Sequence, residues 1–246
     1  MVWQTIITAA GVNHVSFEEN NIAIPKNLIP FQESTILNTA IRSYSHGGET
    51  PHVVIRKEED AHWGTVEIIE KTTNRINFHL IQNETRGALC TAAMALDNIE
   101  SGKPLVIAPG DSYIDGDLSK LIEIFESKEV AAGTLLFQDS HQRWSFARLG
   151  QECKILEMAE KSPISHFAST GLFYFRSPEL FIRAAEWVLR ENMNTGGEFY
   201  LSTALNYLIM NGENVLGIEL PSDFAYTPLS RFSDLQTAKK DNYGKI

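Results

Sequence analysis

The chain has 246 residues and a mass of 27.6 kDa, a length that suits one large domain. Thirty-one acidic and 21 basic residues give a formal net charge of −10, which argues against a general nucleic-acid binder because such a protein needs a basic face. No stretch approaches about 18 consecutive apolar residues, and the N-terminus has no signal-type apolar run, so we expect a cytoplasmic protein without a membrane span.

Strand and helix signals alternate in the first half of the chain. Short β-branched or apolar runs predict strands at residues 3–9, 52–56, 77–82 and 104–109. Runs with apolar residues on one face predict helices at residues 34–44, 60–72, 86–101 and 118–127. This order is typical of a parallel sheet that is covered by helices on both faces.

The pattern changes near residue 130. Strands are predicted at residues 130–137, 144–149, 154–158 and 170–175, with no helix between the first three. Helices at 177–191 and 198–210, a strand at 215–220 and a helical tail from residue 230 follow. The whole pattern predicts an α/β protein with a mixed second half.

Ligands of open parallel sheets bind beyond the carboxyl ends of the strands, where three loops are expected here, at residues 9–30, 82–87 and 109–117. In the first loop Lys26 follows a proline and offers a point charge for phosphate, although a solvent-exposed lysine would look the same. In the third loop Asp111 follows Gly110 and suits Mg²⁺, although it could equally bind its own backbone. Asp117 is predicted to cap the helix that begins after it.

Short segments in a fixed order resemble the sugar nucleotidyltransferase (NTP-transferase) family, whose fold is Rossmann-like, of the glycosyltransferase-A type. Their order along the chain argues against chance. Two of them, Trp144-Ser-Phe-Ala147 and Ala159-Glu-Lys-Ser-Pro-Ile-Ser165, are similar to a bacterial subgroup linked to surface polysaccharide synthesis. The other segments are residues 6–11, residues 25–30, Gln82 with Gly87, Gly110 with Asp111, residues 168–175 and residues 197–200.

The resemblance implies one domain over residues 1–246 with three layers and a mixed central sheet, a nucleotide-binding half at about 1–128 and an acceptor-binding half at about 129–246. It implies that a phosphate oxygen of the acceptor attacks the α-phosphorus of an NTP and releases pyrophosphate, with Mg²⁺ as cofactor. The expected substrates are an NTP, with a pyrimidine favoured, and a phosphorylated sugar or related phospho-compound. The product would serve capsular or lipopolysaccharide synthesis.

The resemblance also implies a role for particular residues. Lys26 would hold the triphosphate, Asp111 the Mg²⁺ and Lys161 the phosphate of the acceptor. Asp223 is the candidate second metal ligand. The nucleotide-binding residues would be Ala10, Gly11, Lys26, Gln82 and Gly87, and the acceptor-binding residues would be Gly110, Glu160, Lys161, Gly171 and Glu198.

Two segments depart from the family pattern. The first loop of the family reads Gly-x-Gly-x-Arg, whereas Gly11 is followed here by Val12-Asn13-His14. The C-terminal Gly-Thr-Pro-Glu-Asp-Leu element of the family is also altered, and residues 225–235 stand in its place in this chain. Arg86 or Lys103 could compensate for the missing arginine.

Two alternatives stay open because of these departures. One is a degenerate, non-catalytic relative that binds a nucleotide or a partner as a regulatory subunit. The other is a glycosyltransferase of the same fold type that uses Asp115-Gly116-Asp117 as its metal motif, although the retained Lys26 and Lys161 disfavour it. A homo-oligomer also stays open, with Trp187 as a candidate contact to a second subunit.

Overall fold

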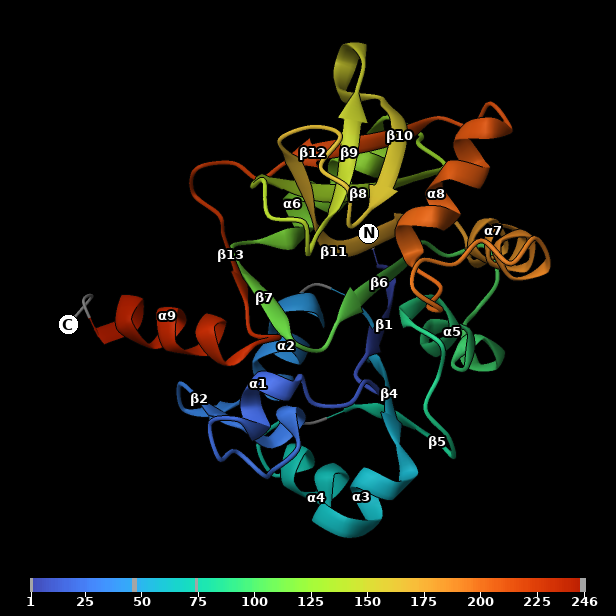
Figure 1. Ribbon diagram of the computed structural model, residues 1–246. Coiled ribbons are helices and arrows are strands. Elements are labelled where there is room, and N and C mark those ends of the chain that lie inside the picture. The colour runs from blue at the N-terminus through green and yellow to red at the C-terminus, as the bar shows by residue number, and fades with distance from the viewer. Residues whose placement is uncertain (1, 46–47, 74, 244–246) are drawn as a thin grey trace.

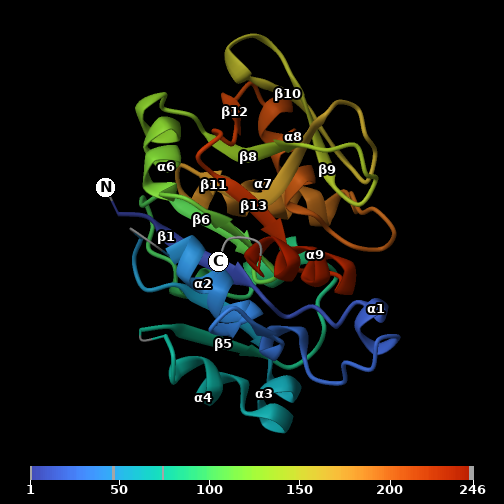
Figure 2. The same cartoon turned by 90° about the vertical axis from the view of Figure 1, so that its left-hand side faces the viewer.

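The computed structural model describes residues 2–45, 48–73 and 75–243 (Figure 1). A central sheet lies between two groups of helices. One group, α2 (Ile36–Ser45) and α6 (Leu118–Ser127), faces the viewer in Figure 2. The predicted α/β fold with a mixed central sheet is therefore confirmed. Among the described residues we find no helix with the length and apolarity that a membrane crossing requires.

The strands of the central sheet run in the order β10-β9-β11-β6-β1-β4-β5, with β8 pairing β11 and β12. β5, β4, β1 and β6 are parallel, and β11 joins β6 in the antiparallel sense. The strands are β1 (Gln4–Thr8), β4 (His52–Arg56), β5 (Asn77–Ile81), β6 (Leu105–Pro109), β8 (Ala132–Gln138), β9 (Ser145–Leu149), β10 (Ile155–Glu160), β11 (Phe167–Phe175) and β12 (Val215–Glu219).

Two short ribbons lie outside this sheet. They pair β2 (Pro30–Phe31) with β3 (Ser34–Thr35), and β7 (Ser112–Asp115) with β13 (Ala225–Pro228). The helices are α1 (Val15–Glu18), α2 (Ile36–Ser45), α3 (Lys57–Trp63), α4 (Thr65–Glu70), α5 (Ala88–Ala93), α6 (Leu118–Ser127), α7 (Pro178–Arg190), α8 (Leu201–Met210) and α9 (Phe232–Tyr243). Single 3₁₀ turns are η1 (Lys26–Leu28), η2 (Leu96–Asn98) and η3 (Gln151–Cys153).

The sheet buries an apolar core on each face. Successive side chains of a strand point to opposite faces, so Ile6 packs toward α5, α7 and α8 while Ile7 packs toward α2 and α6. Both isoleucines are fully buried, which stabilises the fold by about 1.5–3 kcal/mol each. The two cores hold the parallel strands from both sides, so the carboxyl ends of β1, β5 and β6 form a fixed edge for the loops that follow.

Some predicted elements differ from the structure. The predicted helix at 60–72 is two helices, because Gly64 adopts a left-handed conformation with φ 64° and ends α3. The predicted helix at 86–101 contains only α5 and η2. Within the predicted loop at 109–117 lies β7, which forms because β13 pairs with it from far along the chain.

Trp187, the candidate contact to a second subunit, packs within its own chain. Its ring lies 5.4 Å from the ring of Tyr207, between α7 and α8. This intramolecular contact accounts for part of the Trp187 surface and gives no support to a role in an interface.

Candidate functional site

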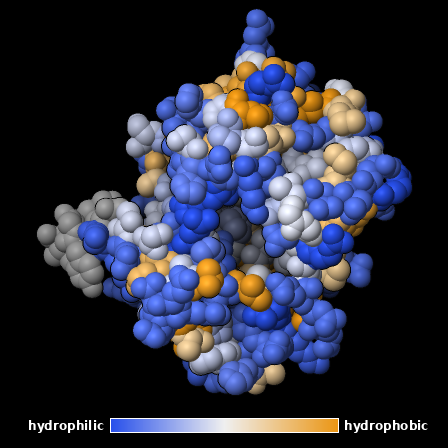
Figure 3. Space-filling model, viewed as in Figure 1, coloured by the Kyte–Doolittle hydropathy of each residue, from blue (hydrophilic) through white to orange (hydrophobic). Residues whose placement is uncertain are grey.

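A cavity of about 280 Å³ opens at the carboxyl ends of β1 and β6. All three predicted ligand loops contribute to its wall, through Ala10 and Gly11, through Gly87, and through Gly110 and Asp111. Figure 3 shows a hollow in the middle of the face turned to the viewer, bordered mainly by hydrophilic residues with some hydrophobic ones along its lower rim. This cavity therefore lies at the sheet edge where the strand-end rule predicts ligands.

Lys26 and Asp111 meet in this cavity, with Lys26 Nζ 2.5 Å from Asp111 Oδ2. Their side chains are only 13% and 23% exposed, so the pair is partly desolvated and stronger than a surface ion pair. Asn13 Oδ1 accepts the backbone N–H of Lys26 at 2.6 Å, which fixes the start of η1. The sequence predicted both charges but not their contact.

Asn27, next to Lys26, is a cavity residue that sequence reasoning missed. Its side-chain amide donates to the Ala9 carbonyl at 2.9 Å and to Glu59 Oε1 at 2.9 Å. Burial raises the pKa of Glu59, while its hydrogen bonds from Asn27 and Thr65 oppose the shift. Asn27 thus ties the loop that carries Lys26 to both β1 and α3.

Gly110 lets β6 and β1 approach each other closely just before Asp111. Its N–H donates to the Thr8 carbonyl at 3.0 Å, and a Cβ at this position would lie 2.8 Å from Ala9 Cβ. The backbone carbonyl of Asp111 accepts the N–H of Leu229 at 2.8 Å, which links the residue to the strand pair β7–β13. Asp111 is therefore held on both sides by backbone hydrogen bonds.

Gly87 joins the two halves of the molecule at the cavity. Its φ is 97°, and a Cβ there would lie 2.5 Å from the carbonyl oxygen of Phe199. Gln82, its predicted partner in reading the base, is exposed and does not line the cavity. Glu84 and Thr85, between the two, line it instead. They lie in the loop that the sequence had marked, but no pattern singled them out.

On the side where the acceptor is predicted to bind, Glu198 and Tyr200 line the cavity. Lys161 lies behind them, with its Nζ donating to the Tyr200 hydroxyl at 2.5 Å, and that hydroxyl in turn donates to the Glu198 carboxylate. Burial, together with the Glu198 carboxylate, raises the pKa of Tyr200. Tyr200 therefore connects the predicted phosphate ligand Lys161 to the cavity, a role that the sequence did not indicate.

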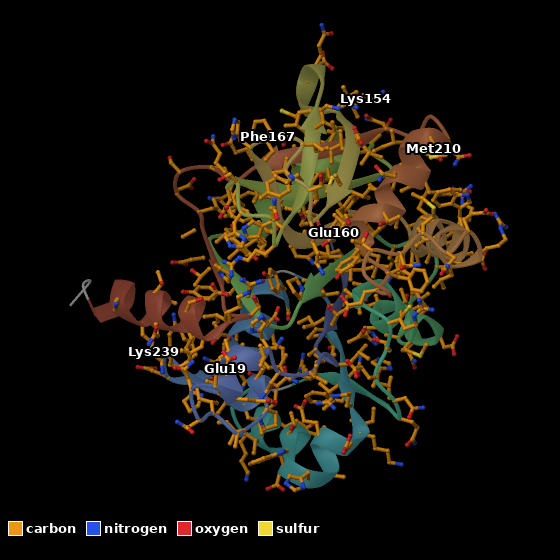
Figure 4. All side chains as sticks on the ribbon, in the orientation of Figure 1. Glu19, Lys154, Glu160, Phe167, Met210 and Lys239 are labelled. Carbon is orange, nitrogen blue, oxygen red and sulfur yellow. The ribbon has the colours of Figure 1, made fainter. Side chains whose placement is uncertain are left out.

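Glu160 and Gly171 do not line the cavity. Ser202 donates to Glu160 at 2.9 Å and Ser145 donates to the same oxygen, while burial raises the pKa of the Glu160 carboxyl. Figure 4 labels Glu160 near the middle of the molecule, at the end of β10. Gly171 has φ 85°, and a Cβ there would lie 3.2 Å from Pro109 of the cavity wall.

Asp223 is not brought to Asp111. β13 pairs Ala225 with Asp115, and the residue that reaches Asp111 is Leu229. In this antiparallel register Asp223 lies beyond Asp115 and away from the cavity. Groups of three or more His, Cys, Asp or Glu that could hold a metal are not found among the described residues.

The alternative metal motif and the candidate compensating cations also lie outside the cavity lining. Asp117 caps α6 as predicted, because its carboxylate accepts the N–H of Ser119 at 3.2 Å. Asp115 is an exposed residue of β7. Arg86 donates to the Gly197 carbonyl at 3.0 Å, and Lys103 binds Glu49 and Glu100 at the opposite end of the strands. Neither cation lines the cavity in this structure.

Comparisons with known proteins agree with this architecture. A sequence model of the family described as nucleotidyl transferase matches residues 22–219. The first loop and the C-terminal element, where the chain departs from the family pattern, lie wholly or partly outside that range.

Two curated relatives are bifunctional GlmU proteins. The protein of Thermotoga sp. (strain RQ2) is 27% identical over 192 residues, which are 75% of this chain and 40% of the relative. That of Lactobacillus helveticus (strain DPC 4571) is 28% identical over 170 residues, or 66% and 36% of the two chains. The chain thus spans about two-fifths of the length of these relatives.

Solved structures with the same fold cover nearly the whole chain. A nucleoside-diphosphate-sugar pyrophosphorylase from Vibrio cholerae RC9 has a TM-score of 0.80 at 19% identity, covering 96% of this chain and 99% of that one. The inositol-1-phosphate CTP transferase from T. maritima has a TM-score of 0.75 at 15% identity, with coverages of 99% and 97%. A UTP-bound UGPase from Acinetobacter baumannii has a TM-score of 0.76 at 12% identity, covering 100% and 95%. At these identities the likeness concerns the fold alone.

Proposed function

Because the chain belongs to the nucleotidyl transferase family, we propose that it joins an NTP to a sugar phosphate or a related phospho-compound and releases pyrophosphate. The observation that carries the proposal is the contact of Lys26 with Asp111 inside the cavity. Two residues expected to serve a triphosphate and its metal come from different loops and lie 2.5 Å apart, on the edge of the sheet where ligands of this fold class bind.

The donor set fits Mg²⁺ that arrives with the nucleotide. Proteins hold this ion at phosphate sites through one or two carboxylates, while substrate oxygens and waters complete its shell. Asp111 offers such a carboxylate on the cavity wall. When bound, the ion would neutralise charge on the phosphates. Lys26, which now neutralises Asp111, would then be free to pair with a phosphate oxygen.

The remaining residues would position the two substrates. Lys26 and the backbone at Ala10 and Gly11 would hold the triphosphate, while Lys161, oriented by Tyr200, would hold the phosphate of the acceptor. An acceptor oxygen forms the new bond to the α-phosphorus, and the bond from that phosphorus to the bridging oxygen breaks, so pyrophosphate leaves with the electron pair. Positioning and charge neutralisation supply the catalysis, with no covalent intermediate.

We propose a pyrimidine nucleotide and a role in surface polysaccharide synthesis as the finer assignment. Two solved structures with this fold, a CTP transferase and a UTP-bound enzyme, support the pyrimidine. The segments at residues 144–147 and 159–165 support the polysaccharide role through their resemblance to that subgroup.

A non-catalytic binding protein is the second candidate, and the first loop favours it. Asn13 stands where the family has its second glycine, and the ring of the following His14 accepts the N–H of Ser16 as the cap of α1. A histidine engaged in this way is a poor substitute for the bidentate arginine.

The test is calorimetric titration of CTP, dTTP, UTP, GTP and ATP, each with and without Mg²⁺. We expect micromolar, Mg²⁺-dependent binding of one nucleotide that is lost in Asp111→Asn and kept in Asp115→Asn, whose carboxylate lies outside the cavity. Pyrophosphate release with a hexose 1-phosphate then separates catalysis from binding. Nucleotide binding without turnover for any phosphorylated acceptor would favour the second candidate. No nucleotide binding would sink the first candidate and leave the second only as a protein that binds a partner.

A further inference from the structure

A second cavity, of about 400 Å³, lies on the other side of the first loop from the cavity that holds Lys26 and Asp111. Val12 lines both cavities, while the consecutive residues Pro25 and Lys26 line one each. A single layer of chain therefore divides the two spaces. Arg56 and Trp63 contribute to the wall of the second cavity.

Arg56 stands at the carboxyl end of β4, in the middle of the parallel strands. On one side it pairs with Ile81, the last residue of β5. On the other side the register of β4 with β1, which sets Thr8 opposite Val54, continues to place Ala10 opposite Arg56. The guanidinium therefore belongs to the same sheet edge as the loop that begins at Ala10.

The guanidinium of Arg56 has no hydrogen bond to any residue that the structure describes. Its Nε is buried without a partner. The nearest carboxylates, of Glu58 and Glu59, lie 3.8 and 3.9 Å from its terminal nitrogens, too far for hydrogen bonds. The Glu59 carboxylate is already engaged by Asn27 and Thr65.

An arginine in this state is prepared for an anion. Its side chain is only 22% exposed, and its buried Nε–H has lost water without gaining an acceptor. A buried N–H donor without an acceptor costs free energy, and a bound oxyanion would recover that cost by accepting the hydrogen bond. The planar guanidinium fits two phosphate oxygens at once, as a lysine cannot.

We propose that the second cavity receives the terminal phosphates of the NTP, and then the released pyrophosphate, with Arg56 as their ligand. The inference rests on the proposed function, which puts the α-phosphate beside Lys26 and Asp111. The triphosphate would cross the loop at Val12, so its two ends would be held by different strands. Glu18 and Glu58 on the rim oppose the anion, which favours its departure after the reaction.

The experiment measures binding of Mg²⁺-pyrophosphate, of the preferred NTP and of its monophosphate by calorimetry. Arg56→Met keeps the apolar stem and removes the charge, and Arg56→Lys keeps the charge without the two-oxygen geometry. Arg148→Met is the matched control, because Arg148 is an exposed residue of β9 that pairs with Glu157. Thermal unfolding checks that each variant is folded.

We expect Arg56→Met to weaken pyrophosphate and NTP by about 10- to 100-fold while monophosphate binding changes less than about twofold. Arg56→Lys should lose less affinity for pyrophosphate and NTP than Arg56→Met does. Glu58→Gln should bind pyrophosphate about two- to fivefold more tightly. Unchanged pyrophosphate affinity in Arg56→Met, or equal weakening of NTP and monophosphate, overturns this inference and leaves the proposed function standing. If the wild-type protein binds neither nucleotide nor pyrophosphate, the proposed function falls, and this inference falls with it.

Discussion

Lysine–carboxylate clusters stand at both ends of the parallel strands. At the carboxyl ends, Lys26 lies 2.5 Å from Asp111. At the amino ends, Lys103 lies 2.6 Å from Glu49 and 2.8 Å from Glu100. The cavity at the amino ends is also the larger, about 970 Å³ against about 280 Å³. Neither ion-pair distance nor cavity size distinguishes a substrate site in this protein.

The surroundings of the two lysines differ in a way that does distinguish them. Lys103 is held by two carboxylates, and hydrogen bonds from it to Glu100 and Glu49 raise the pKa of its ammonium group. Lys26 has one carboxylate partner, which a metal ion could take over. Gly11, which lines the same cavity as Lys26, also has open space beside its Cα. A lysine that can exchange its partner, next to accessible backbone, is the better mark of a phosphate site.

The largest expected effect separates the two lysines directly. Lys26→Ala should lower kcat/KM for the nucleotide by about 10²- to 10³-fold, because a positioned charge at the transferring phosphate is lost. Lys103→Ala, the matched control at the amino ends, should change it by less than about twofold. Steady-state pyrophosphate release measures both. Equal losses in the two variants would refute the assignment of the site to the carboxyl ends.

Two glycines with positive φ test the same contrast through stability. Gly87→Ala should lower the free energy of unfolding by about 2–4 kcal/mol, because its Cβ would overlap the Phe199 carbonyl and its φ is 97°. Gly102, with φ 76° at the amino ends, has open space around it, so Gly102→Ala should cost about 1 kcal/mol. Urea unfolding of the two variants compares these values. A smaller cost at Gly87 would contradict the tight junction described there.

If Lys26 exchanges Asp111 for a phosphate, removing the Asp111 charge should strengthen metal-free nucleotide binding and abolish the effect of Mg²⁺ on binding. Asp111→Asn removes the charge that now occupies Lys26, so nucleotide binding without Mg²⁺ should become about two- to fivefold tighter. The strengthening of binding by Mg²⁺ should vanish in the same variant. Glu49→Gln likewise removes a negative charge from the partner of a lysine, Lys103, and should leave both the metal-free affinity and the effect of Mg²⁺ unchanged. Calorimetry in the presence of a chelator supplies the metal-free values.

The smallest effect concerns the cavity at the amino ends, where His52 Nδ1 lies 2.8 Å from His79 Nε2. Burial lowers the pKa of both histidines below 6.5, and the facing imidazole adds to the shift at His52 while Glu49 opposes it. As the pH falls below about 6.5 the unfolded chain binds protons that the folded chain does not, so stability decreases.

We expect a loss of less than about 1 kcal/mol between pH 7.5 and 5.5, since both rings are partly solvated. His79→Gln should flatten this dependence, and His141→Gln, at an exposed histidine, should not. Urea midpoints at the two pH values give the comparison, and an unchanged slope in His79→Gln would contradict it.

Elements with a strong local signal were predicted most closely from the sequence. The predicted ranges 52–56 and 118–127 are the bounds of β4 and α6. A β-branched run in the first and a capped amphipathic run in the second are local patterns that specify a strand and a helix without help from distant residues. The break at Gly64 was missed, since glycine is also tolerated inside helices. β7 and β13 were missed because each forms only against the other.

The same division applies to the site. Asp111 lies two residues after β6, whose end the strand-end rule places beside that of β1, whereas Lys26 lies far along the loop that follows β1, so the contact of the two side chains did not follow from the sequence. Gln82 and Asp223 lie in segments whose direction is set by tertiary contacts, and both are exposed away from the cavity. Arg56 was hidden as the last residue of a predicted strand, since no local pattern reveals an arginine that lacks acceptors.

The hydrogen bond from Leu229 to the Asp111 carbonyl has a consequence for how the protein is made. Phe232, in the same segment, donates its N–H to the Ser16 hydroxyl of the first loop at 3.1 Å. A nascent chain that still lacks this segment already carries Lys26 and Asp111 but not the strand that clamps them. On the proposed function, nucleotide binding should therefore require this segment, and ribosome-bound chains that end before residue 225 should not bind nucleotide.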